Sequence, residues 1–102
     1  MSFRLAECIR IGSKETKQCT GMFFQYLEDK VTHSCALGAA ALGALGTSGE
    51  YISYSVLEEV FPELERRVVI DDLQPKLFRA IEILNDQKKW TREQIADWVE
   101  TL

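Results

Sequence analysis

The sequence predicts an α+β fold: a single, mostly helical domain over residues 1–102, with four to five short helices and one β-hairpin. Three observations predict it. A length of 102 residues leaves room for one domain. Apolar residues recur at helical spacing in several segments, and one aromatic run followed by β-branched residues interrupts them. A hydrophobic content of 46% with 27% charged residues is typical of a globular domain.

The first predicted element is a helix over Phe3–Ile11. Its inner face follows the i, i+3, i+4, i+7 spacing and consists of Leu5, Cys8, Ile9 and Gly12. Because glycine readily adopts a left-handed conformation, Gly12 is expected to cap the end of this helix. A polar link over Ser13–Lys17 is expected to follow.

A β-hairpin is predicted next. Gly21–Leu27 is dense in aromatic residues and lies between turn formers, which favours a strand. Glu28–Lys30 would form the turn, and Val31–Ser34 contains two β-branched residues that favour a returning strand. A helix through Phe23–Leu27 is the alternative, because short apolar runs are ambiguous.

The segment Cys35–Gly46 is predicted to form a buried central helix into which the hairpin leads. After the cysteine it contains only alanine, leucine and glycine. A glycine inside a helix costs about 1 kcal/mol, so Gly38 and Gly43 need a physical reason. Close approach of a second backbone supplies one, since a glycine has no side chain to prevent it. The run Gly46–Gly49 is expected to end the helix.

A third helix is predicted from a capping box that begins at Ser55 and includes Glu58. Pro62 is expected to end it. Its apolar residues are Val56, Leu57, Val60 and Phe61. The apolar run that follows, Val68–Ile70, is either a short edge strand or a buried connector.

Two more helices complete the predicted fold. Asp72 is expected to cap the fourth helix, with Pro75 in its first turn. The inward residues of that helix are Leu77, Phe78, Ile81 and Leu84. Asn85–Lys89 would form a turn, and a second capping box over Thr91–Gln94 opens the last helix. That helix is expected to bury Ile95, Trp98 and Val99, with Leu102 beyond them.

Charge and cysteine content limit the classes of partner and the compartment. The net charge of −4 argues against a surface that neutralises phosphates, and residues 31–65 contain five acidic residues without a Lys or Arg. Such a surface can bind a basic partner or mimic nucleic acid, although most acidic faces are simply solvated. No secretory signal opens the chain, and no apolar run approaches the ~20 residues of a membrane span. We expect a cytoplasmic protein with reduced thiols and no membrane association.

Two separated segments resemble a family of small uncharacterised bacterial and phage proteins. The first is Ser34–Ala40, which contains the string CALGA; the second includes Leu84–Asp86 and continues through Trp90–Val99, with the pattern ND…WT-x-E-x-IA-x-W. These strings cover about a quarter of the chain. The resemblance implies a bacterial or phage origin and a single cytoplasmic domain. Since no activity is assigned to that family, it implies no site residue.

Cys35 and His33 are the candidate catalytic residues. A thiol at a helix N-terminus is stabilised as a thiolate by the helix dipole and free N–H groups. His33 stands two residues earlier, so that on a strand the two side chains would point to one face. Together they would form the minimum set for nucleophilic catalysis. The competing interpretation is a packed structural cysteine, because a wholly apolar helix follows.

No cofactor or metal site is expected. The potential ligands Cys8, Cys19, His33 and Cys35 lack the close C-x2–4-C or H-x3–5-H pair that structural zinc sites usually contain.

A nucleic-acid interface through the last two helices is a second alternative. Arg92 and Gln94 lie where a recognition helix carries its base-reading residues. Phosphates would, however, be repelled by the acidic residues Glu93, Asp97 and Glu100 of the same segment.

The sequence favours a small non-enzymatic accessory or regulatory protein that acts through protein–protein contacts, by binding a partner or by self-association. It contains no complete catalytic set, and it combines an acidic surface with surplus apolar residues. Tyr51, Ile52 and Tyr54 are the predicted contact residues, because they stand between the glycine-rich stop and the third helix. The alternatives are a thiol-dependent enzyme that uses Cys35 with His33, and a nucleic-acid binder.

Overall fold

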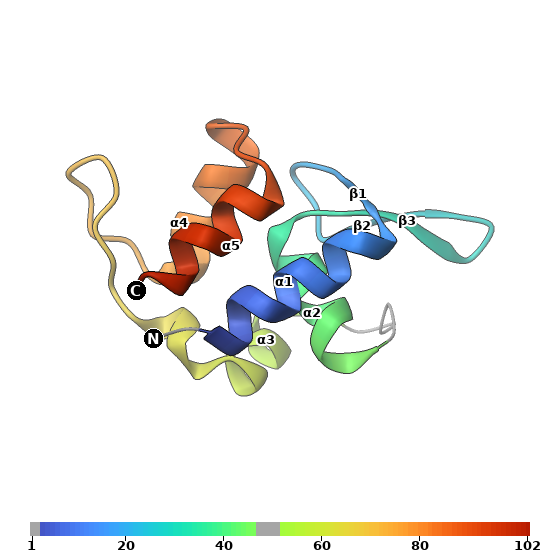
Figure 1. The fold of residues 1–102 in the computed structure, drawn as a ribbon, viewed down its shortest axis with the longest axis horizontal. Helices are drawn as coiled ribbons and strands as arrows, with labels where there is room; N and C mark the ends of the chain where they lie inside the picture. The colour runs from blue at the N-terminus through green and yellow to red at the C-terminus, as the bar shows by residue number, and fades with distance from the viewer. Residues whose placement is uncertain (1–2, 47–51) are drawn as a thin grey trace.

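The computed structural model of the protein describes residues 3–46 and 52–102 (Figure 1). It is α+β, as the sequence predicts. The helices are α1 (Phe3–Glu15), α2 (Ala36–Leu45), α3 (Tyr54–Val60), α4 (Leu77–Glu82) and α5 (Arg92–Glu100). They form one body of 41 × 26 × 20 Å with a small sheet. The β-hairpin projects from one end of its long axis and a loop over residues 66–76 from the other (Figure 1).

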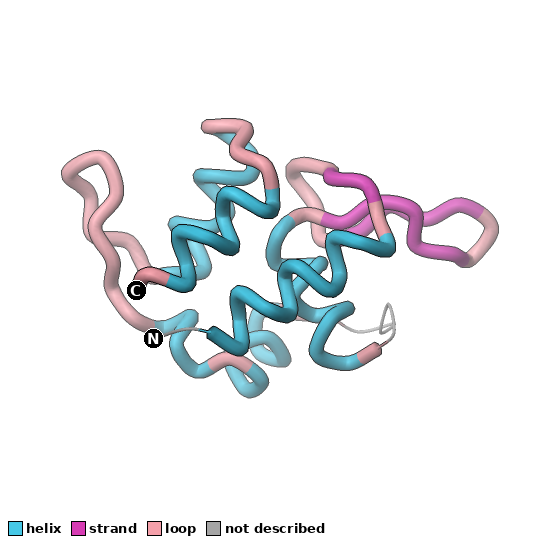
Figure 2. The backbone as a smooth tube through the Cα atoms, in the orientation of Figure 1, coloured by secondary structure: helices cyan, strands magenta, loops and turns pink. Residues whose placement is uncertain are grey.

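The sheet has three strands, β1 (Lys17–Gln18), β2 (Phe24–Leu27) and β3 (Lys30–Ser34), in the order β1-β3-β2 (Figure 2). The antiparallel pairing of β2 with β3 confirms the predicted hairpin, and the helical alternative for Phe23–Leu27 is wrong. The tight turn is formed by Glu28 and Asp29, with φ of 51° and 65°, as a two-residue hairpin turn requires. β1 pairs with β3 in parallel, which was not predicted, because two residues are too few to leave a pattern.

Three glycines let backbones touch: Gly12 and Gly43 where α1 meets α2, and Gly38 where α2 meets the base of the hairpin. A Cβ on Gly38 would lie 3.0 Å from the carbonyl carbon of Phe23, and one on Gly43 would lie 2.8 Å from that of Cys8. The predicted close approach at both glycines is therefore confirmed. Gly12 performs the same function from α1, since its Cβ would lie 2.6 Å from the carbonyl carbon of Ala39. The prediction that Gly12 caps α1 is wrong, because the helix continues to Glu15.

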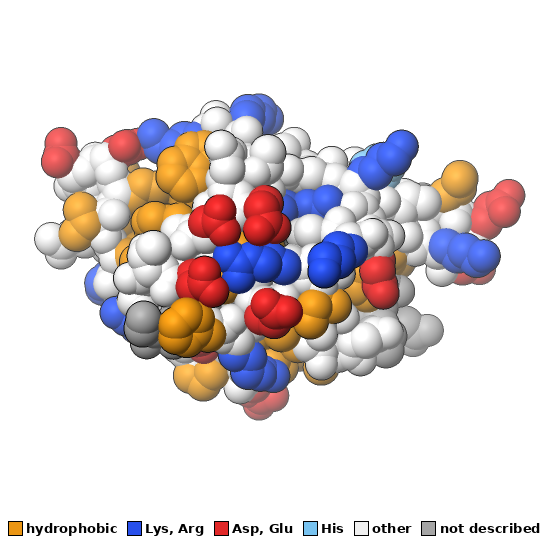
Figure 3. Space-filling model, in the orientation of Figure 1, with side chains coloured by type: hydrophobic (Ala, Val, Ile, Leu, Met, Phe, Trp, Pro, Cys, Tyr) orange, Lys and Arg blue, Asp and Glu red, His pale blue; other side chains and the backbone are white. Residues whose placement is uncertain are grey.

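The core lies between α1, α2, α4 and α5, and the segment 57–64 adds Leu57, Phe61 and Leu64 to it. Figure 1 shows α1 and α5 side by side. Charged side chains gather on the face that both helices share (Figure 3). There, Arg10 of α1 donates to Glu93, Asp97 and Glu100 of α5, at 3.2, 2.7 and 3.2–3.3 Å. These acceptors raise the pKa of Arg10, chiefly through Glu100. Three of the acidic residues thus hold α5 against α1 through ion pairs with Arg10.

The third helix begins two residues earlier than predicted. Ser53 is the N-cap of α3, and its hydroxyl accepts the amide of Val56 at 3.3 Å. The predicted capping box at Ser55 is wrong, because the backbone is already helical there. Pro62 does end the helix, as predicted, and opens a 3₁₀ turn, η1 (Pro62–Glu65).

The loop over residues 66–76 is a short hairpin-like excursion. Asp71 and Asp72 form its tip with φ of 49° and 65°, between Ile70 and Leu73, which exchange backbone hydrogen bonds. The prediction that Asp72 caps the fourth helix is therefore wrong: α4 begins at Leu77 after an N-cap residue, Lys76, whose side chain makes no capping bond. For the run Val68–Ile70, the structure shows a connector with only isolated bridges, in which Val68 is buried and Val69 exposed.

The predicted turn at Asn85–Lys89 is wrong as well. Ile83–Gln87 continues α4 as a π-helical turn, η2, which places Asn85 inside the protein. The capping box over Thr91–Gln94 is confirmed, with both of its hydrogen bonds present at the start of α5. Among the described residues no helix has the length and apolar character that crossing a membrane requires.

Candidate functional site

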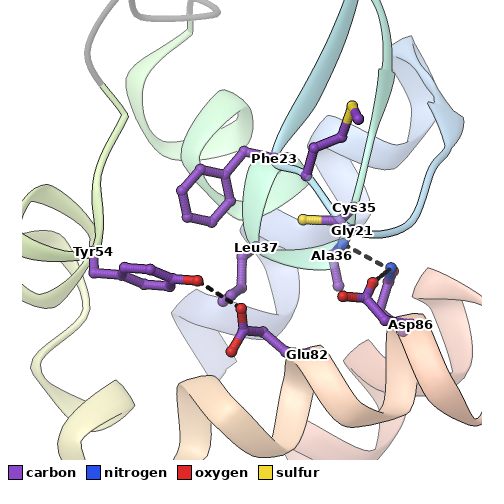
Figure 4. Close-up of a pocket in the computed structure, with 10 residues that line it drawn as sticks. Gly21, Phe23, Cys35, Ala36, Leu37, Tyr54, Glu82 and Asp86 are labelled. Atoms are coloured by element: carbon purple, nitrogen blue, oxygen red, sulfur yellow. Dashed lines mark hydrogen bonds between the residues drawn. The ribbon is translucent and has the colours of Figure 1, made fainter.

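A pocket of about 340 Å³ opens where the base of the hairpin, the start of α2, α3 and η2 meet (Figure 4). Its apolar wall consists of Met22, Phe23, Ala36 and Leu37. Its polar wall consists of Tyr54, Glu82, Asn85 and Asp86, and Gly21 and Cys35 complete the lining. Segments far apart in the sequence therefore share one concave site, which is the usual form of a ligand-binding pocket.

Asn85 connects the elements around this pocket. Its side chain is 1% exposed, and its Oδ1 accepts the amide of Ala36 at 3.1 Å and Nε2 of Gln18 at 2.9 Å. Its Nδ2 donates to the carbonyl of Cys19 at 2.9 Å and to Asp86 Oδ1 at 2.7 Å. These four bonds use the full capacity of the amide. One side chain thus joins η2, the strand region and the first residue of α2.

Tyr54 and Glu82 form the opposite side of the pocket. The Tyr54 hydroxyl donates to Glu82 Oε2 at 2.6 Å, as the dashed line in Figure 4 shows. This hydrogen bond to a carboxylate raises the pKa of Tyr54 to about 12. The ring of Tyr54 meets Phe23 edge-on at 5.3 Å between centroids and lies 5.0 Å from Phe78. Tyr54 is therefore a fixed wall residue with a protonated hydroxyl.

The two carboxylates, Glu82 and Asp86, differ in their neighbours. Glu82 lies 3.5 Å from the guanidinium of Arg79, whose side chain is 51% exposed. Asp86 accepts from the neutral amide of Asn85, and no Lys or Arg in the described part of the chain pairs with it. The pocket consequently carries negative charge beside an apolar wall.

Cys35 lies at the pocket as the N-cap of α2, with its sulfur accepting the amide of Gly38 at 3.4 Å. The helix N-terminus does favour a thiolate there, as predicted. Burial has the larger effect, because the side chain is only 8% exposed, and it raises the pKa of the Cys35 thiol to about 11. Burial therefore outweighs the helix N-terminus, and the thiol stays protonated near neutral pH, as the interpretation of a packed structural cysteine expects.

His33 is not part of the pocket lining. It lies near the end of β3 with Nδ1 2.9 Å from the hydroxyl of Thr32. Cys35 stands one residue beyond β3, so the strand alternation does not extend to its thiol. The structure therefore gives the two predicted catalytic residues different surroundings.

The predicted contact residues are only partly described. Tyr51 lies outside the described residues. Ile52 is half-buried and packs against the core, while Tyr54 is 44% exposed and lines the pocket. Of the three, Tyr54 is the residue that the structure brings to the candidate site.

Arg92 occupies a buried position of its own. Its guanidinium donates to the carbonyls of Ser13, Thr16 and Ser34 and to the hydroxyls of Thr16 and Ser34, at 2.7–3.3 Å. Burial lowers the pKa of Arg92. Arg92 is thus unavailable to phosphates, and the side chain of Gln94 belongs to the capping box. Neither residue is placed as the nucleic-acid hypothesis requires.

Metal ligation has no support from side-chain clustering. Among residues 3–46 and 52–102, no three His, Cys, Asp or Glu side chains gather as a metal site would need. The cysteines Cys8, Cys19 and Cys35 are free and buried.

Sequence reasoning missed Phe23, Glu82, Asn85 and Asp86 as site residues. Asn and Asp favour turns, so the sequence predicts a turn at Asn85-Asp86. One signal could have indicated otherwise: Asn85 follows Leu77, Ile81 and Leu84 at helical spacing. Nothing local identifies its partners, since Ala36 is 49 residues away.

No family model matches the chain, and neither a curated protein nor a solved structure is detectably similar to it, so its site is interpreted from its own chemistry.

Proposed function

We propose that this chain is a small non-enzymatic accessory or regulatory protein of the cytoplasm, and that it acts by binding another protein at the pocket. The single observation that carries the proposal is the pocket itself. It joins an apolar wall to a polar rim in a volume of about 340 Å³, which is enough for a side chain of a partner.

The residues at the mouth support a protein contact. Met22 is 50% exposed and Tyr54 is 44% exposed, so both present apolar surface to solvent. Methionine adapts to irregular partners, and tyrosine is enriched among the residues that dominate binding energy. Polar groups around an apolar centre are the usual anatomy of an interface.

The chemistry of Cys35 favours binding over catalysis. A nucleophilic cysteine needs a thiolate near neutral pH and a base within hydrogen-bond reach. The pKa of Cys35 is about 11, and the hydrogen bond of His33 goes to Thr32. The thiol therefore supports the role of a helix cap rather than that of a nucleophile.

Site-specific photo-cross-linking tests the proposal. The photoreactive amino acid p-benzoyl-phenylalanine replaces Met22 in the protein made in its own host, and irradiated samples are analysed by denaturing electrophoresis and mass spectrometry. Leu73 is the matched control, because it is 58% exposed but lies on the 66–76 excursion, which does not line the pocket.

The expected result is a discrete adduct with a second protein from position 22 and not from position 73. Adducts of equal yield from both positions, or none from position 22, would contradict the proposal. An adduct of twice the mass of the chain would instead identify self-association as the contact made at the pocket.

A further inference from the structure

We infer that the pocket accepts a basic side chain of the partner, a lysine or an arginine, whose charged head reaches Asp86 and Glu82 while its aliphatic stem lies along Phe23 and Leu37. This inference rests on the proposed function, since it specifies what the partner inserts. It follows from the charge of the polar wall, the nature of the apolar wall, and the state of the helix N-terminus beside them.

The polar wall carries negative charge that the described part of the protein compensates only in part. Asp86 receives a hydrogen bond from Asn85 at 2.7 Å, but that donor is neutral and leaves the charge in place. Glu82 receives another neutral donor, the hydroxyl of Tyr54, at 2.6 Å. In the described part of the chain, Arg79 lies 3.5 Å from Glu82, so this pair offsets charge on Glu82 but none on Asp86. A cation from outside would therefore find two acceptors.

The two carboxylates are also held in place before a ligand arrives. The bonds from Tyr54 and Asn85 each fix one oxygen, and Asn85 is itself held by three further hydrogen bonds. A preorganised acceptor costs little to order on binding. Figure 4 shows Glu82 and Asp86 on the helical side of the pocket and Phe23 across from Glu82.

The apolar wall suits the rest of a basic side chain. Lysine and arginine carry three or four methylene groups that favour apolar contact while the head stays polar. Leu37 and Phe23 provide that contact surface. The rings of Phe23 and Tyr54 also attract a cation, because the face of an aromatic ring carries partial negative charge. A compact metal ion or a purely polar ligand would leave this wall unused.

An anionic ligand is disfavoured although α2 begins at the pocket. A helix N-terminus binds anions through its free N–H groups. Two of those groups are occupied here: Ala36 donates to Asn85, and Gly38 donates to the sulfur of Cys35. With these donors occupied and two carboxylates nearby, the pocket repels phosphate and carboxylate groups.

Titration with blocked tripeptides, followed by ¹H–¹⁵N NMR, tests the inference. Acetyl-Gly-Lys-Gly-amide is compared with its norleucine analogue, and the arginine peptide with its citrulline analogue, so that each pair differs in charge at nearly constant shape. Pentylamine serves as a free amine. The same titrations are run on Asp86→Asn and on the matched control Asp29→Asn, which removes an equal charge at the exposed hairpin tip.

The expected result is that at least one basic peptide shifts the amides of Gly21, Phe23, Leu37 and Asp86, and that its neutral analogue binds about tenfold more weakly. Asp86→Asn should lower the affinity for the basic peptide by a similar factor, while Asp29→Asn should leave that affinity unchanged. The dispersion of each spectrum reports whether the variant is folded.

Three results would overturn the inference: equal shifts from charged and neutral peptides, an Asp86→Asn variant that binds like Asp29→Asn, or a pocket that takes pentylamine but neither basic peptide. If these occur while the photo-cross-link at Met22 still captures a protein, the proposed function stands and only the basic side chain is wrong. Basic peptides that bind while no cross-link forms would instead contradict the proposed function.

Discussion

The side chain of Asn85 accepts the backbone amide of Ala36 at 3.1 Å, and this bond joins the π-helical turn of η2 to the first residue of α2. Both groups are buried, so neither has water as an alternative partner. The same oxygen also accepts from Gln18. One amide therefore joins the helical wall of the pocket to the start of α2.

Replacing Asn85 by alanine should destabilise the fold by about 2–4 kcal/mol, because the amide of Ala36 and the carbonyl of Cys19 would lose their partner inside the protein. Urea unfolding followed by circular dichroism measures the change. Gln87→Ala is the control, since Gln87 belongs to the same turn but is exposed, and it should change stability by less than about 0.5 kcal/mol. Equal effects at both positions would show that Asn85 is not the connection described.

Gly12→Ala and Gly43→Ala should each destabilise the protein by about 1–3 kcal/mol. Alanine in place of glycine normally stabilises a helix by about 0.5–1 kcal/mol. Here the sign is reversed, because the new methyl group would overlap the backbone of the facing helix. Thermal unfolding checks the sign, with Lys14→Ala as an exposed control on α1. A gain in stability at Gly12 would mean that the helices can separate at no cost.

Arg92→Lys should cost about 2–3 kcal/mol although it keeps the charge. A guanidinium presents five donors in a plane, whereas an ammonium cannot reach carbonyls and hydroxyls of Ser13, Thr16 and Ser34 at once. Chemical denaturation measures the loss. Arg66→Lys, at an exposed position, should leave the midpoint unchanged.

Alkylation of Cys35 by iodoacetamide should be slow and should keep accelerating with pH. With a pKa of about 11, the reactive thiolate rises about tenfold per pH unit up to pH 10, without a plateau. Peptide mapping by mass spectrometry separates Cys35 from Cys8 and Cys19. A plateau below pH 8 would reveal an activated thiolate and would support the thiol-enzyme alternative.

The same thiol should make the fold less stable at alkaline pH. Between the ordinary thiol pKa of about 9 and the folded value of about 11, the folded state binds more protons than the unfolded state. Stability from this group is therefore complete below about pH 9 and declines as the pH rises toward 11. Urea midpoints at pH 8, 9.5 and 10.5 should fall more steeply in the parent protein than in Cys35→Ser.

The sequence predicted correctly those elements that form through interactions between residues close in the chain. The hairpin and the capping box at Thr91 each depend on residues within one segment, and the structure confirms both. The close approach at Gly38 and Gly43 is confirmed as well, although the facing backbones, at Phe23 and Cys8, belong to other segments. Gly12 and Asp72 were misassigned because glycine near a helix end and aspartate before a helix usually are caps. Their true roles, a helix contact and a hairpin tip, are set by segments elsewhere in the chain.

The candidate site was the less predictable part. Of its residues, only Cys35 and Tyr54 were singled out from the sequence. Cys35 was placed correctly at a helix start, but its pKa depends on burial by distant segments, which a sequence pattern does not express. Glu82 and Asp86 are ordinary helix-surface types until α3 and the hairpin base are brought beside them.

The contacts of Arg10 with α5 have a consequence for biosynthesis. Arg10 and Glu100 are 90 positions apart, so α1 is synthesised long before the residues of α5 that its Arg10 contacts. Closing a loop of that length costs about 4 kcal/mol in chain entropy, before any contact repays it. On the ribosome, α1 can pack against α2 early, but its outer face stays bare until residues 93–100 have emerged. During that interval the nascent chain exposes the apolar side chains that Ile95, Ala96 and Val99 of α5 later cover, and this is the stage at which chaperones would engage it.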